Sequence, residues 1–109
     1  MPGEQFSISS ETQRRIDLLF APALRDEVVA LLAAECGRNL ALSSNASEAA
    51  IERIQFAALK QSGGDMGHLM RAIELAQADW RDLLVAAGFA VDVHAHERWL
   101  PHAPETPGQ

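Results

Sequence analysis

The sequence contains one cysteine, Cys36, and no tyrosine, and its valine, isoleucine and threonine residues are sparse. A lone cysteine cannot form an internal disulfide, so no oxidising compartment is indicated and we expect a cytoplasmic protein. The scarcity of β-branched residues, beside abundant alanine and leucine, favours helices over strands. The fold class that this composition predicts is all-α.

Basic residues are also few, because 9 lysines and arginines stand against 15 acidic residues and give a net charge of −6. Lysine and arginine supply the affinity for phosphate backbones and anionic membranes, so we expect neither nucleic-acid nor membrane binding. The longest apolar runs, such as residues 28–34, are far shorter than the roughly 20 residues of a membrane span. The first five residues lack the basic and apolar regions of a signal peptide.

The length of 109 residues, with 48% hydrophobic side chains, suffices for one hydrophobic core. We divide the chain into a loose leader (1–9), a single helical domain (10–100) and a disordered, proline-rich tail (101–109). The expected architecture is a compact bundle of four main helices followed by a short C-terminal helix.

Two helices are expected in the first third of the chain. Ser10 and Gln13 fit a capping box that begins a helix of about ten residues, on which Arg14 and Arg15 are exposed. Pro22 ends this helix and suits the first turn of the next. In the second helix, apolar residues recur at intervals of three and four on one face, and they are Leu24, Val28, Leu31, Leu32 and Cys36. Cys36 is therefore expected to be a buried, unreactive thiol.

A third helix is expected to begin near Asn45 and to end at residues 62–64, and Asp65 caps the fourth. The fourth helix has the clearest pattern, with alternating intervals of three and four between Met66, Leu69, Ile73, Ala76, Trp80, Leu83 and Ala87. Gly88 ends it. This stripe favours internal packing against the second and third helices over a coiled-coil dimer interface.

Phe56 departs from the pattern of the third helix, since it lies on the charged side, nearly opposite the apolar stripe of Ile51 and Ile54. An exposed phenylalanine is unfavourable, so the leader, the fifth helix with Trp99, or another subunit must cover it. The surplus apolar residues Phe56, Leu59 and Trp99 are therefore our candidate interaction surface.

Four histidines suggest a metal-site hypothesis built on His94, His96 and Glu97, in a short fifth helix that Asp92 caps. His94 and Glu97 lie three residues apart and share a helical face, whereas His94 and His96 diverge. The chain contains neither the His-Glu-x-x-His nor the Cys-x-x-Cys spacing that makes a zinc site specific. We therefore expect surface or capping imidazoles, and no cofactor.

No motif in the sequence fixes a chemistry. Asp79 and Asp82 lie three apart on the fourth helix and could act as an acid–base pair, but exposed acids beside Arg81 are the simpler interpretation. The predicted function is a small acidic helical module without catalytic activity, which self-associates or binds a protein partner. The alternative hypothesis is a metal- or small-ligand-binding protein that uses His94, His96 and Glu97.

Overall fold

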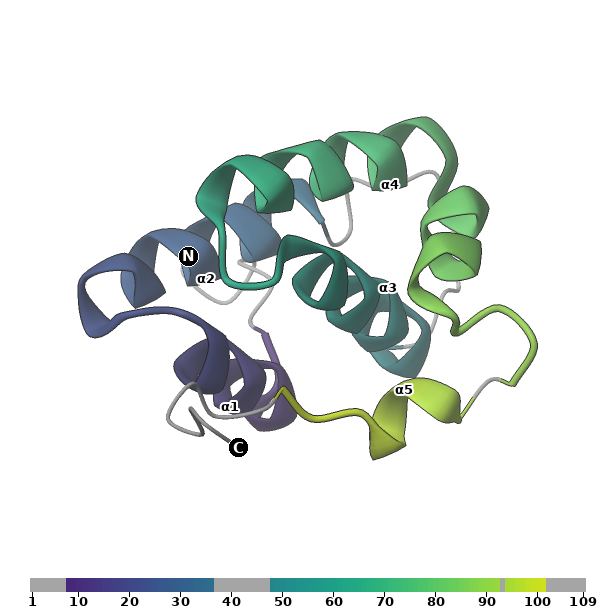
Figure 1. Cartoon of the computed structure of the whole chain (residues 1–109), viewed down its shortest axis with the longest axis horizontal. Helices are drawn as coiled ribbons and strands as arrows, with labels where there is room; N and C mark the ends of the chain where they lie inside the picture. Colours follow the sequence, from purple (N-terminus) through teal and green to yellow (C-terminus); the bar gives the residue numbers. More distant parts are fainter. Residues whose placement is uncertain (1–7, 37–47, 93, 102–109) are drawn as a thin grey trace, which may run out of the picture.

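The computed structural model describes residues 8–36, 48–92 and 94–101. These ranges form five helices, which are α1 (Ser10–Leu19), α2 (Pro22–Glu35), α3 (Glu48–Ser62), α4 (Met66–Ala87) and α5 (Ala95–Arg98). Figure 1 shows their arrangement. The described residues contain no strand, so the predicted all-α architecture is confirmed. The predicted start near Asn45 lies outside the described residues, as do residues 1–7 and 102–109, and the division into leader, domain and tail stays a prediction.

Helix α3 is the centre of the fold, and it packs against α1, α4 and α5. Residues 54–59 are all buried, which means that this stretch is covered on every side of the helix. The predicted charged side of α3 is therefore absent along its middle, where neighbouring elements cover the whole circumference. No helix in the described part of the chain is both long and apolar enough to cross a membrane.

The N-cap of α1 is Ser9, one residue before the expected Ser10, which is the first residue of the helix. The Ser9 Oγ accepts a hydrogen bond from the Thr12 backbone N–H at 3.1 Å. Arg14 is exposed as predicted, but the expectation that Arg15 is exposed is wrong, since only 3% of Arg15 is accessible. Pro22 occupies the first turn of α2, as predicted.

Both ends of α4 are confirmed. The Asp65 Oδ2 accepts the His68 backbone N–H at 2.8 Å and caps the first turn. Gly88 ends the helix with a φ of +80°, in the left-handed region that favours glycine. Before α4, Gly64 also has a positive φ of +89°, and a Cβ there would lie 2.7 Å from the Leu19 carbonyl oxygen. This contact shows why the α3–α4 turn needs glycine.

Helix α4 bends at Asp79, whose φ of −161° and ψ of 95° are those of extended backbone. The Asp79 Oδ1 accepts the Arg81 backbone N–H at 3.1 Å, so Asp79 acts as the cap of a second helical segment. Asp82 stands at the third position of that segment, where an acidic residue is favoured. The break turns the last part of α4 around the central helix (Figure 1). The apolar stripe predicted the extent of α4 but not this bend.

Candidate interaction surface

The aromatic residues singled out in the sequence meet, but they do so inside the chain. Phe56 is 1% exposed and Leu59 is fully buried, so the expectation that these two residues form an interaction surface is wrong for the single chain. Trp99 is half-buried, and its ring centroid lies 6.3 Å from that of Phe56. The His96 ring stands edge-on to Phe56 at 5.2 Å. The segment around α5, which was one of the elements expected to cover Phe56, packs against its ring.

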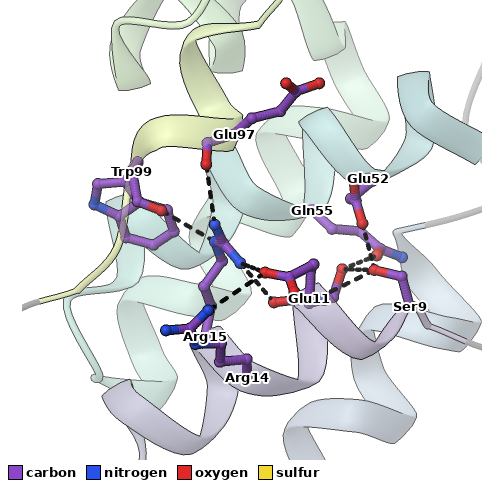
Figure 2. Close-up of polar contacts among 9 residues, drawn as sticks. Ser9, Glu11, Arg14, Arg15, Glu52, Gln55, Glu97 and Trp99 are labelled. Carbon is purple, nitrogen blue, oxygen red and sulfur yellow. Dashed lines mark hydrogen bonds and ion pairs between the residues drawn. The ribbon is translucent and has the colours of Figure 1, made fainter.

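Arg15 completes the cover of Phe56, with its guanidinium carbon 4.1 Å from the ring centroid. The Arg15 Nε donates to the Trp99 carbonyl at 3.1 Å, and Nη2 donates to the Glu97 carbonyl at 3.4 Å. The Arg15 Nη1 donates to the Glu11 carbonyl at 2.9 Å and to its carboxylate at 2.8 Å. Figure 2 shows that the guanidinium joins α1 to the C-terminal segment. Arg15 is therefore a structural tie between two distant parts of the chain.

A row of polar contacts runs from the start of α1 through α3 to the end of α2. The Ser9 hydroxyl donates a hydrogen bond to the Glu52 carboxylate, and its oxygen lies 2.9 Å from the Thr12 hydroxyl oxygen (Figure 2). Thr12 donates to the Gln55 side-chain oxygen at 3.4 Å, and the Gln55 Nε2 donates to the Cys36 carbonyl at 3.1 Å. Thr12 and Gln55 are buried. These hydrogen bonds join the start of α1 and the end of α2 to α3.

Cys36 is fully buried, as predicted from its place on the apolar face of α2. Burial raises the pKa of its thiol to about 12, because the charged thiolate is poorly solvated inside the fold. The thiol is therefore neutral near pH 7, and a neutral thiol is a weak nucleophile. Cys36 acts as a core side chain.

The three residues of the metal hypothesis do not come together. The His94 Nδ1 lies 3.1 Å from the Glu97 carboxylate on the surface, and this hydrogen bond is the main cause that lowers the pKa of Glu97. His96 is 2% exposed and packs instead against Phe56 and Phe89. Within the described ranges, no group of three or more histidine, cysteine or acidic residues could hold a metal ion.

Among the described residues, the exposed large apolar side chains are Met70, Val85, Val91 and Leu100. Met70, which is 51% exposed, lines a hollow of about 150 Å³ between α2 and α4. The other lining residues are Leu31, Glu35, Ile73, Glu74 and Gln77. Ile73 is buried and Leu31 half-buried, so the base of the hollow is apolar. We call this feature the α2–α4 groove.

The α2–α4 groove lies where α2 and the first part of α4 run side by side (Figure 1). At one end, the Gln77 Nε2 donates to the Glu35 carbonyl at 2.9 Å and to its carboxylate at 3.0 Å. These two bonds tie the helices together at that end. The groove is bordered, one helical turn from its lining residues, by three exposed residues with small or no side chains, which are Ala34, Gly67 and Ala78. A ligand therefore meets little side-chain bulk at the edges of the groove.

A second hollow, of about 210 Å³, lies near the C-terminal end of α3 and is lined by Gln61, His68, Arg71, Ala72, Leu75 and Leu83. Its polar groups are partly engaged within the fold, since Gln61 donates to the Ala86 carbonyl at 3.0 Å and His68 lies 3.5 Å from the Asp65 carboxylate. The lining residues include no serine, cysteine or carboxylate, so this hollow does not combine a nucleophile with a base.

Comparison with known proteins gives no relative, because no family model, curated protein or solved structure matches the chain. The α2–α4 groove was not predicted from the sequence, and it combines a half-exposed apolar side chain with a defined hollow.

Proposed function

We propose that this chain is a non-enzymatic interaction module that binds a helical segment of a partner protein in the α2–α4 groove. The observation that carries the proposal is the half-exposed Met70 beside Leu31 and Ile73, in a hollow between two helices. A third helix can lay its apolar face into the space between two neighbouring helices. Methionine suits such a surface, because its flexible thioether adapts to the shape of a partner.

The state of the potentially reactive groups supports a binding function over catalysis. Cys36 is buried and neutral, and the Asp79 carboxylate caps a helical segment. His94 pairs with Glu97 at the surface. These groups lie in different parts of the fold, whereas catalysis by a nucleophile needs a base within hydrogen-bond reach.

The contribution of Met70 can be judged from its exposure of 51%. Full burial of a methionine side chain contributes about 1.5–3 kcal/mol, so covering its exposed half contributes roughly 1 kcal/mol. A Met70→Asp variant loses this contribution and adds the cost of desolvating a carboxylate. We therefore expect Met70→Asp to weaken partner binding by at least about tenfold, which corresponds to about 1.4 kcal/mol.

The experiment is a selection of helical peptides, displayed as a library, against the full chain. The dissociation constant of each selected peptide is then measured for the unchanged chain, for Met70→Asp and for Val85→Asp. Val85 is the matched control, because it is exposed on the same helix but does not line the groove. We expect only Met70→Asp to lose affinity. A selection in which no peptide depends on Met70 would contradict the proposal.

Light scattering over a range of concentrations tests self-association of the same surface. We expect a monomer at all concentrations. A dimer that dissociates in Met70→Asp, but not in Val85→Asp, would show that the groove binds a second copy of this chain and not a different protein. Phe56 is unsuitable for this test, because its burial means that Phe56→Asp would disrupt the core.

A further inference from the structure

The groove has acidic residues on both of its helices. Glu35 and Glu74 line the hollow, from α2 and α4 respectively. Glu27 lies one turn before Leu31, on the same face of α2, and is exposed. A helix lying in the groove would therefore meet carboxylates along both of its sides.

The charges of Glu27 and Glu74 are not neutralised by ion pairs within the described part of the chain. Arg71 is three residues from Glu74, but the two side chains form no ion pair there. Arg25, the one basic residue of α2, turns toward α1 and donates to the Phe20 carbonyl at 3.0 Å. The groove is thus an apolar strip with acidic edges.

We infer that the α2–α4 groove selects a basic amphipathic helix of a partner protein, an inference that rests on the function proposed above. The apolar face of that helix covers Met70, while lysine or arginine side chains on its flanks reach Glu27 and Glu74. Their long aliphatic stems can lie along apolar surface and still place a charge at its edge. A second copy fits less well, because two copies joined through this groove would bring the same glutamates together.

The length of the groove sets the length of the ligand. Met70 and Gln77, which both line it, are seven residues apart on α4, or about 10.5 Å along a helix. The ligand therefore presents about two turns to the groove, with apolar residues at intervals of three and four and basic residues beside them. Exposed Gly67 and Ala78 leave room for its backbone to approach α4 closely.

The test uses two helical peptides that share the apolar positions of a peptide selected in the experiment above. One carries lysine at every flanking position, and the other carries glutamate. Their binding to the full chain is measured by fluorescence anisotropy at two salt concentrations. We expect the lysine peptide to bind about tenfold more tightly or better at low salt, with a preference that shrinks as salt screens the charges.

Variants of the chain locate the effect. Glu27→Lys combined with Glu74→Lys reverses the charge at the groove, and Asp26→Lys combined with Asp82→Lys makes the same change in net charge outside the lining of the hollow. We expect the first pair to reverse the peptide preference and the second pair to preserve it. A circular dichroism spectrum of each double variant serves as the control that it remains helical.

Two results would overturn the inference. Equal affinity for the two peptides, with binding still dependent on Met70, would refute the basic ligand and leave the proposed function standing. An equal effect of the two charge-reversed pairs would show that net charge, and not the groove, sets the preference. Loss of all dependence on Met70 would instead remove the proposed function itself.

Discussion

Removal of the Arg15 side chain is expected to destabilise the fold strongly, because this residue joins α1 to the C-terminal segment. Its guanidinium donates to the carbonyls of Trp99 and Glu97 and lies 4.1 Å from the Phe56 ring centroid. Hydrogen bonds from a charged group contribute about 1.5–3 kcal/mol each, and a desolvated cation–π contact up to about 2 kcal/mol. Relief of the desolvation of Arg15 offsets part of this sum. We expect Arg15→Ala to lower the free energy of unfolding by about 3 kcal/mol.

The assay is urea unfolding followed by tryptophan fluorescence, with Arg14→Ala as the matched control. Arg14 is the neighbouring residue, and its side chain is 58% exposed, so its removal should change the free energy of unfolding by less than about 0.5 kcal/mol. Arg15→Met retains an apolar stem over Phe56 and should fall between these values. A Trp80→Phe background leaves Trp99 as the only tryptophan, so its emission reports directly on the C-terminal segment. A loss below about 1 kcal/mol for Arg15→Ala would refute the reasoning.

Three further predictions concern single side chains. Asp79→Ala removes the cap of the second segment of α4 and should cost about 1 kcal/mol of stability in thermal unfolding, whereas Asp79→Asn should retain most of it. Glu11 has a pKa below its usual 4.5, chiefly through its hydrogen bond from Arg15. Its contribution to stability is therefore present above pH 4.5 and is lost as the pH falls through the lowered pKa, and Glu11→Gln should flatten this part of the stability curve. Cys36 is buried with a pKa near 12, so a thiol reagent should label the folded chain far more slowly than the chain in urea, and equal rates would contradict its burial.

The local signals in the sequence were sufficient to place most helix ends. Asp65, Gly88 and Pro22 act within a turn of their own position, so the bounds of α4 and the start of α2 followed from residue type. The bend of α4 also had a local signal, because Asp79 and Asp82 have the spacing of a helix start. The continuous apolar stripe concealed that signal, since it has the same period on both sides of the break.

The contacts between distant residues could not be predicted in the same way. Arg14 and Arg15 are identical in type, and only the packing of the whole fold makes Arg15 buried and Arg14 exposed. The burial of Phe56 depends on the C-terminal segment returning across α3, which no local pattern specifies.

The candidate groove was missed for a related reason. Met70 stands beside the apolar stripe of α4 and not within it, so its significance appears only when α2 is placed alongside. The placement of two helices relative to each other depends on the packing of the whole core. The binding function therefore stays a prediction, and no local pattern in the sequence indicated where such a groove would lie.

The most direct test of the proposed groove is a nuclear magnetic resonance titration of the isotope-labelled chain with the lysine-flanked helical peptide. We expect saturable shifts of amide and methyl signals to concentrate at Leu31, Met70 and Glu74, on the facing sides of α2 and α4. Shifts that gather instead around Val85 or Val91, or the absence of any saturable shift, would contradict binding in the α2–α4 groove.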